Sequence, residues 1–291
     1  MTLSRREFAR FGLAGAVAAV LRPLAFAAAP VDRFAVSTWS FHNYFENTRY
    51  GKPEFKPDVW WKVEQVVSVV KEKLGITSLE LSSAHLASFE PKYLEEINAF
   101  MTKQGAKFIH LSDNMKNVNL GKNADDQKTF EQLIDVAKAL RIPSMRVNTG
   151  DGKIDDVIPR FKALAAYGEK AGVEIVIENH FGLSAEPKNV AAIIKAVGKN
   201  ISSCPDFGLL PDDDSHWPGL DAMFATATKM CSAKFHGLDS EGKHAAFDLK
   251  RCYDALTTAK FPGYISFEYE GNLEPLAQLQ MMKALAEKWL A

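Results

Sequence analysis

After its amino-terminal segment, the chain alternates between short apolar runs and longer amphipathic segments. Each short run is rich in apolar residues and is bounded by polar or glycine-rich positions, the pattern of a buried strand. Eight such runs predict strands over residues 34–38, 77–81, 106–111, 144–148, 173–180, 201–207, 232–239 and 263–270.

The segments between these runs have helical periodicity. The first begins near Pro57 and Asp58 and ends at Gly75, residues that favour a helix start and a helix stop. Further helices are predicted over 125–141, 155–172, 187–198 and 273–290. Strands that alternate with helices pair in parallel, and eight such units make a (β/α)8 TIM barrel, which ordinarily has about 250 residues. We therefore expect a single α/β domain over residues 28–291.

Composition agrees with one large core and excludes a nucleic-acid partner. Hydrophobic residues make up 47% of the chain, and the formal net charge is −1 at pH 7. A surface that binds a phosphate backbone needs an excess of basic residues, which this chain lacks. The sequence has no low-complexity tract or linker that would separate a second domain, and it leaves a homo-oligomer open.

Residues 1–27 are typical of an export signal. Arg5 and Arg6 precede an apolar run at 12–21, and Ala25–Ala27 offer a small-x-small cleavage site. This pattern resembles a twin-arginine signal, which predicts contact with the export machinery and a periplasmic or otherwise exported protein. An uncleaved anchor is the alternative, but the apolar run is short for a membrane span, so no stable membrane insertion is expected after cleavage.

The cysteines do not indicate a metal or redox motif. Cys204, Cys231 and Cys252 have neither CxxC nor zinc-knuckle spacing. We expect each to be buried, and a Cys231–Cys252 disulfide is the less favoured alternative.

Four of the predicted strands end in a side chain that can bind a metal. Glu178, Asp206, His236 and Glu268 follow one another at roughly thirty-residue intervals, the length of one βα unit. Their side chains would then converge at one mouth of the barrel. Three carboxylates and one imidazole suit one divalent ion, with Mn²⁺ the first choice and Mg²⁺, Co²⁺ or Zn²⁺ as alternatives.

Each of these residues also has a simpler explanation. Glu178 could form a rim salt bridge, Asp206 could cap a loop, and His236 could be a hydrogen-bonded core residue. Their shared position at strand ends favours the metal site. Alternation along the last strand places Glu270 on the same face as Glu268, further out, as a candidate substrate contact.

Other residues at strand ends are candidates to line a pocket. Aromatic faces suit the apolar face of a sugar, while imidazole and amide groups suit its hydroxyls. The candidate substrate-binding residues are Trp39, His110, Asn148, Asp239 and Glu270, and Phe41, His42, Glu80 and Arg146 lie beside them at strand ends. His180 shares a face with Glu178, which makes it a candidate substrate or acid–base group, with a supporting hydrogen bond as the alternative.

The motifs ENH at 178–180, KFHGLD at 234–239 and GYISFEYEG at 263–271 together resemble the sugar phosphate isomerase/epimerase family of xylose isomerase-like barrels. The resemblance implies one divalent metal, a carbohydrate substrate and proton transfer beside a carbonyl. It also implies that Glu178 and Glu268 exchange the proton from opposite faces of the substrate. The metal would stabilise the enediolate that forms when the proton leaves.

The chain departs from these relatives after Asp206. Many sugar epimerases have a histidine three residues further on, whereas Leu209 stands here, and Lys250 stands where the AP-endonuclease branch would need a histidine. Export and the lack of a phosphate-binding loop favour an unphosphorylated sugar. A lyase or hydrolase of an oxidised (keto) glycoside, and a non-catalytic carbohydrate-binding barrel, are the alternatives.

Overall fold

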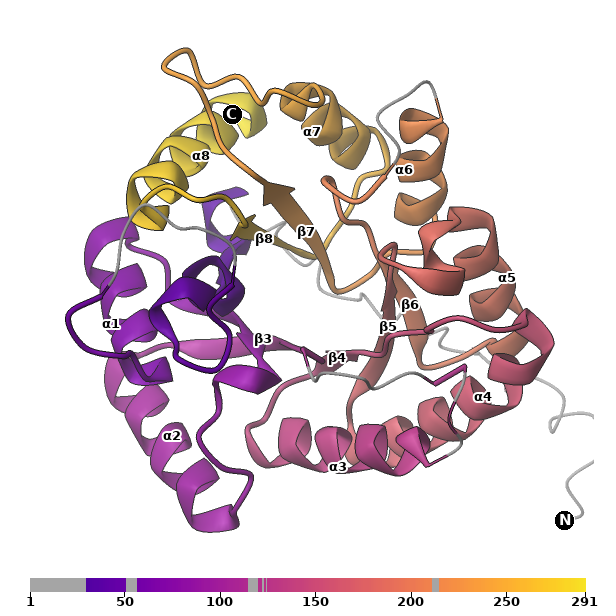
Figure 1. The fold of residues 1–291 in the computed structure, drawn as a ribbon. Helices are drawn as coiled ribbons and strands as arrows, with labels where there is room; N and C mark the ends of the chain where they lie inside the picture. Colours follow the sequence, from indigo (N-terminus) through magenta and orange to yellow (C-terminus); the bar gives the residue numbers. More distant parts are fainter. Residues whose placement is uncertain (1–29, 51–56, 115–119, 122, 124, 211–214) are drawn as a thin grey trace, which may run out of the picture.

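Eight strands, each parallel to its hydrogen-bonded neighbours, form the centre of the molecule in the computed structural model (Figure 1). The structure describes residues 30–50, 57–114, 120–121, 123, 125–210 and 215–291, so the predicted signal at 1–27 lies outside it. The strands are β1 (Phe34–Ser37), β2 (Ser78–Ser82), β3 (Lys107–Ser112), β4 (Ser144–Arg146), β5 (Glu174–Glu178), β6 (Ile201–Cys204), β7 (Met230–Phe235) and β8 (Tyr264–Tyr269). All eight predicted strands are confirmed.

The sheet closes almost completely on itself. Neighbouring strands follow the order β6-β5-β4-β3-β2-β1-β8-β7, so that β1 pairs with both β2 and β8. Between the β6 and β7 segments, isolated parallel bridges join Ser203 to Ala227 and Asp206 to Ser232. The result is a nearly closed barrel, and the predicted TIM-barrel architecture is confirmed.

The helices form a ring around the barrel (Figure 1). They are α1 (Val63–Leu74), α2 (Pro91–Gln104), α3 (Asp126–Ala139), α4 (Ile154–Ala171), α5 (Pro187–Val197), α6 (His216–Phe224), α7 (Leu249–Thr258) and α8 (Pro275–Leu290). Four of the five predicted helices agree with these bounds within two residues, and α2, α6 and α7 are additional.

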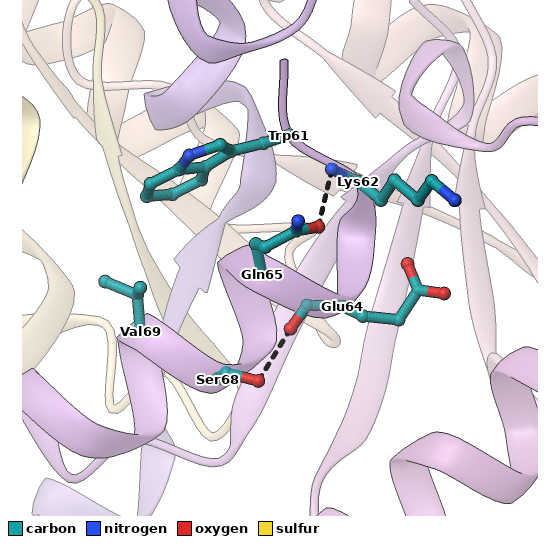
Figure 2. Close-up of a pocket in the computed structure, with 6 residues that line it drawn as sticks. All are labelled: Trp61, Lys62, Glu64, Gln65, Ser68 and Val69. Carbon is teal, nitrogen blue, oxygen red and sulfur yellow. Dashed lines mark hydrogen bonds between the residues drawn. The ribbon is translucent and has the colours of Figure 1, made fainter. Parts of the chain in front are cut away.

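The first helix begins later than the sequence predicts. Pro57 and Asp58 lie outside α1, which starts at Val63. The backbone N–H of Lys62 donates to Oε1 of Gln65 over 2.8 Å at a shallow surface pocket (Figure 2). This side-chain cap satisfies a backbone donor at the helix start, and it fixes the boundary there.

The core lies between the barrel and the helices, because parallel strands covered on both faces are buried on both. Cys204, Cys231 and Cys252 are buried with free thiols, so the expected burial is confirmed and the alternative disulfide is not formed. Among the described residues, no helix combines the length and the apolar character needed to cross a membrane.

Candidate active site

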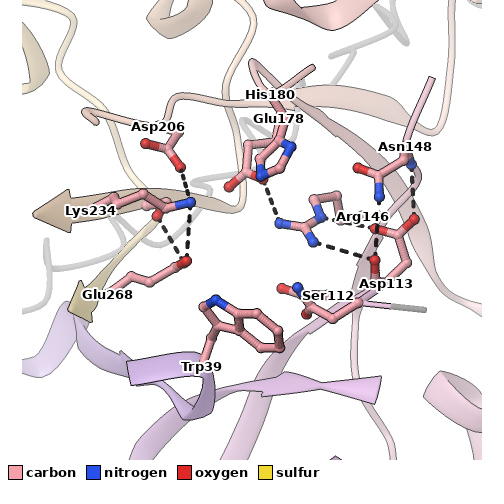
Figure 3. A network of polar contacts seen from close by, with 12 residues as sticks. Trp39, Ser112, Asp113, Arg146, Asn148, Glu178, His180, Asp206, Lys234 and Glu268 are labelled. Carbon is pink, nitrogen blue, oxygen red and sulfur yellow. Dashed lines mark hydrogen bonds and ion pairs between the residues drawn. The ribbon is translucent and has the colours of Figure 1, made fainter. Parts of the chain in front are cut away.

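Three of the four predicted metal ligands meet at the carboxyl end of the strands (Figure 3). Glu178 is the last residue of β5, Asp206 follows β6 by two residues, and Glu268 lies in β8. All three are buried. In a TIM barrel this end of the strands carries the active site.

A lysine occupies the space between these carboxylates. The Nζ atom of Lys234, on β7, lies 3.1 Å from Oδ2 of Asp206, 3.2 Å from Oε1 of Glu268 and 3.5 Å from Oε2 of Glu270. Its side chain is 2% exposed. Burial lowers the pKa of Lys234, but the surrounding carboxylates outweigh burial and raise it well above its usual range. The carboxylates therefore favour the charged ammonium form of Lys234.

An arginine holds the remaining ligand. Nη1 of Arg146 lies 2.5 Å from Oε2 of Glu178, and its Nε donates to Oδ1 of Asp113 over 2.9 Å. Both carboxylates and the guanidinium are buried. A planar guanidinium can bridge two carboxylates because its N–H donors point in fixed directions.

His236 lies outside this cluster. It is the first residue after β7, its side chain is exposed, and its backbone N–H donates to Nε2 of His244. Gly237 follows with φ of 157°, and there the chain leaves the barrel. Burial lowers the pKa of His236 and Glu270 opposes the shift, so the imidazole lies near the outer carboxylate. It does not form a metal-binding group with the three buried carboxylates among the described residues.

As arranged, the donors do not fit a divalent ion. Among the residues that the structure describes, no group of three or more His, Cys, Asp and Glu side chains is placed to hold a metal. Arg146 and Lys234 stand between the carboxylates, and two unit charges 4 Å apart repel by about 4 kcal/mol at an effective dielectric constant of 20. A divalent ion among the same oxygens would meet the Lys234 ammonium at close range. The metal site predicted from Glu178, Asp206, His236 and Glu268 stays a prediction.

The two glutamates predicted to exchange a proton differ in their electrostatic surroundings. Burial raises the pKa of Glu178, but Arg146 and Lys234 together outweigh it and leave that pKa below its usual value. Burial raises the pKa of Glu268 well above its usual range, and the nearby carboxylates of Glu80, Glu178 and Glu270 add to this against Lys234. Relative to an ordinary glutamate, the surroundings therefore favour the ionised form of Glu178 and the protonated form of Glu268.

Burial and the Lys234 ammonium also act in opposite directions on Asp206. Burial raises its pKa to about 7, and the Lys234 ammonium opposes the shift. Oδ1 accepts a hydrogen bond from the backbone N–H of Gly208 over 2.7 Å, while Oδ2 meets Lys234 as an ion pair without hydrogen-bond alignment.

His180 lies beside Glu178 at the same mouth (Figure 3). Its Nδ1 atom is buried and has no hydrogen-bond partner among the described residues. Burial lowers the pKa of His180 to about 4, with Glu178 opposing the shift. The imidazole is therefore neutral at pH 7, and its buried Nδ1 is an unsatisfied polar atom at the site.

Trp39 and Glu270 form the outer layer of the site. Trp39 lies in the 3-10 helix η2 (Thr38–Tyr44), and its Nε1 donates to Oε1 of Glu270 over 3.0 Å. The Tyr50 hydroxyl donates to the same oxygen. Burial raises the pKa of Glu270, yet Lys234 and these donors hold it at about 2. Glu270 is thus an ionised carboxylate, further out than Glu268, as alternation predicts.

A cleft of about 400 Å³ opens beside Trp39. Trp39 and Tyr50 give it aromatic walls, and Asn47 and Asn114 give it amide groups. Its one charged lining residue, Arg49, donates to the backbone oxygen of Asn43 over 2.7 Å and lies over the Trp60 ring. The cleft combines an aromatic face with hydrogen-bonding amides.

The other predicted substrate contacts are placed differently. Asn148 supports the site, because its backbone N–H donates to Oδ2 of Asp113 over 3.1 Å. His110 is buried against Oγ of Ser144, at the opposite end of β4. Asp239 is exposed and accepts backbone N–H groups of its own turn, from Glu241 and Lys243. The structure therefore does not bring His110 or Asp239 to the cluster.

Lys234 and Asp113 are the residues that sequence reasoning missed. Lys234 lies inside an apolar strand, two residues before His236 and therefore on the same face, which was the available signal. Asp113 comes immediately after β3, at the same edge as the other strand ends.

Solved structures resemble the whole barrel at low sequence identity. An L-ribulose 3-epimerase aligns with a TM-score of 0.69 and 12% identity, covering 89% of this chain and 94% of the epimerase. A 3-keto-D-glucoside 4-epimerase from E. coli aligns with a TM-score of 0.64 and 13% identity, covering 88% of this chain and 98% of the epimerase. A xylose isomerase-like TIM barrel protein from Mycobacterium smegmatis, in complex with magnesium, aligns with a TM-score of 0.64 and 15% identity. The alignment covers 89% of this chain and 98% of that protein. At these identities the likeness shows the fold.

Sequence comparison supplies the family. No curated protein matches the chain. The model of the family described as xylose isomerase-like TIM barrel matches residues 70–287, nearly the whole barrel. The chain belongs to the xylose isomerase-like TIM barrel family.

Proposed function

We propose that the protein is an isomerase or epimerase that moves a proton beside a carbonyl group of an unphosphorylated sugar or sugar derivative. The observation that carries the proposal is the placement of Glu178 and Glu268, two buried carboxyl groups on β5 and β8 that share one polar network but have separate cationic partners. Carboxyl groups whose surroundings favour opposite protonation states are suited to act as base and acid.

In the proposed reaction, the Glu178 carboxylate takes a proton from the carbon next to the carbonyl. The electron pair of the broken C–H bond forms a carbon–carbon double bond, and the π pair of the carbonyl moves to its oxygen, which gives an enediolate. The carboxyl group of Glu268 then returns a proton. In an epimerase the proton returns to the same carbon from the other side and inverts it. In an isomerase it goes to the former carbonyl carbon, and the hydroxyl proton of the first carbon passes to the former carbonyl oxygen. Arg146 and Lys234 give the site a positive potential where negative charge develops.

The carbohydrate assignment rests on the cleft beside Trp39. An indole ring packs well on the apolar face of a sugar, and the amides of Asn47 and Asn114 suit its hydroxyls. Arg49 is already engaged by Asn43 and Trp60, which favours a neutral sugar over a sugar phosphate. The names of two solved neighbours, an L-ribulose 3-epimerase and a 3-keto-D-glucoside 4-epimerase, agree with a ketose or keto-glycoside substrate.

We also propose export through the twin-arginine pathway, on the strength of Arg5, Arg6 and the apolar run behind them. A periplasmic enzyme meets unphosphorylated sugars, which agrees with the proposed substrate class. The metal ion predicted from the sequence is not part of the proposed steps, because the arrangement of donors does not fit it.

The test is solvent exchange with a substrate panel. Purified protein is incubated in D₂O with ketoses and keto-glycosides, each paired with its phosphorylated form, and proton NMR follows the signals beside the carbonyl. We expect deuterium to enter an unphosphorylated member, together with formation of its epimer or isomer. Release of a free aglycone would support the lyase or hydrolase alternative, and no exchange with any member would support the non-catalytic barrel.

A further inference from the structure

Three carboxylates around Lys234 each point one oxygen at the same nitrogen atom. Oδ2 of Asp206, Oε1 of Glu268 and Oε2 of Glu270 lie 3.1, 3.2 and 3.5 Å from Nζ. Three carboxylate oxygens therefore lie within ion-pair distance of one ammonium nitrogen.

The second oxygen of each carboxylate is held elsewhere. Oδ1 of Asp206 accepts the backbone N–H of Gly208, and Oε2 of Glu268 accepts the hydroxyl of Ser232 over 3.2 Å. Oε1 of Glu270 accepts from Trp39 and from Tyr50. Each carboxylate is therefore oriented by an independent donor so that its free oxygen faces the lysine.

The main chain around Asp206 is also fixed. Its backbone N–H donates to Oδ1 of Asn179 over 2.8 Å, and its carbonyl oxygen accepts from Nδ2 of the same residue over 3.0 Å. The asparagine thus clamps the residue that makes the shortest contact with Lys234.

A glycine makes room for the lysine side chain. A Cβ atom at position 208 would lie 3.1 Å from Cγ and 3.3 Å from Cδ of Lys234, closer than ordinary contact. The methylene stem of Lys234 thus fills a space that any other residue at position 208 would restrict. The oriented oxygens and the space for the stem together form a preorganised binding site for one ammonium group.

We infer that the ammonium group of Lys234 is the cation of this active site and occupies the position where the sequence predicts a divalent metal. This inference rests on the proposed function only in assigning the cluster to catalysis. The lysine supplies the positive charge that holds Asp206, Glu268 and Glu270 together. A divalent ion enters the same oxygens only when the ammonium leaves.

The test measures metal binding without any substrate. Wild-type protein, Lys234→Met and the control Lys250→Met are dialysed against EDTA and then titrated with MnCl₂ by calorimetry. Met keeps the length of the stem and removes the charge, whereas Lys250 forms an exposed pair with Asp254 on α7. We expect weak binding by the wild type and the control. We expect Mn²⁺ binding on the order of 100-fold tighter in Lys234→Met, because three carboxylates then lack their cation.

Two outcomes of the titration overturn the inference. Tight, stoichiometric Mn²⁺ binding by wild-type protein is the first, and it decides the matter even if Lys234→Met does not fold. Unchanged weak binding by a folded Lys234→Met is the second. Sugar exchange in D₂O by EDTA-treated wild-type protein separates this inference from the proposed function. Exchange that needs added metal overturns the role of Lys234 alone, whereas no exchange with any sugar refutes the proposed function and leaves the metal titration standing.

Discussion

Lys234 and Asp206 form an ion pair of 3.1 Å in which the side chains are 2% and 0% exposed. Removing two charges from water is costly, and well-packed apolar residues of similar size are often as stabilising as a buried pair. Such a pair is therefore poorly explained by stability alone. Its position at the carboxyl end of the strands, beside Glu268 and Glu270, agrees instead with a role in the chemistry of the site.

The second buried cation gives a prediction about stability. Arg146→Met leaves the carboxylates of Glu178 and Asp113 buried without their partner, which should lower the free energy of unfolding by about 3–5 kcal/mol. Urea denaturation followed by circular dichroism measures the change. Lys199→Met, which breaks an exposed pair with Glu169, is the control and should cost less than about 1 kcal/mol. Equal small losses in the two variants would show that the buried network contributes little.

Burial of His110 predicts a dependence of stability on pH. Burial lowers its pKa to about 3 in the folded protein, whereas the unfolded imidazole keeps its ordinary value of 6.5. The unfolded chain therefore binds an extra proton below pH 6.5, so this residue's contribution is fully present above that pH and is lost as the pH falls toward 3. At pH 5 the loss is about 2 kcal/mol.

The variant His110→Gln isolates this contribution. Unfolding free energies of both proteins are measured between about pH 5 and pH 7.5. The free energy lost on lowering the pH to 5 should be about 2 kcal/mol smaller in the variant than in the wild type. His85, whose pKa burial also lowers to about 3, is present in both proteins and does not affect the difference. Parallel curves would contradict the burial argument.

The fold was predictable because periodicity and spacing repeat eight times along the chain. The carboxylates were predictable as well, since Glu178, Asp206 and Glu268 lie at or just beyond the ends of apolar runs, where parallel strands share one edge.

The choice between Lys234 and His236 was not predictable in the same way. Alternation gives both residues the same face, so only the point where the strand ends separates them. β7 ends at Phe235 and the chain turns away at Gly237, which leaves Lys234 inside and His236 outside. Strand boundaries are the least certain part of a sequence-based prediction, and here one residue decides whether Lys234 or His236 lies among the carboxylates.

The amino-terminal prediction is tested by fractionation. Replacement of Arg5 and Arg6 by lysine should trap the precursor in the cytoplasm, because a twin-arginine signal depends on the paired guanidinium groups. Immunoblots of cytoplasmic and periplasmic fractions measure the ratio of precursor to mature protein. An unchanged rate of appearance of mature protein outside the cytoplasm would refute the route.

The roles of Glu178 and Glu268 are tested most directly by deuterium exchange in single variants. Glu→Gln keeps the size of the side chain and removes its basic oxygen, so each variant should lose turnover by about 10²-fold or more. Glu178→Gln and Glu268→Gln are each incubated in D₂O with both epimers of the active sugar, and proton NMR follows exchange from each. We expect each variant to exchange one epimer and to fail on the other, because the two residues act on opposite faces. Near-wild-type exchange of both epimers in both variants would contradict it, and would transfer the role of base to His180.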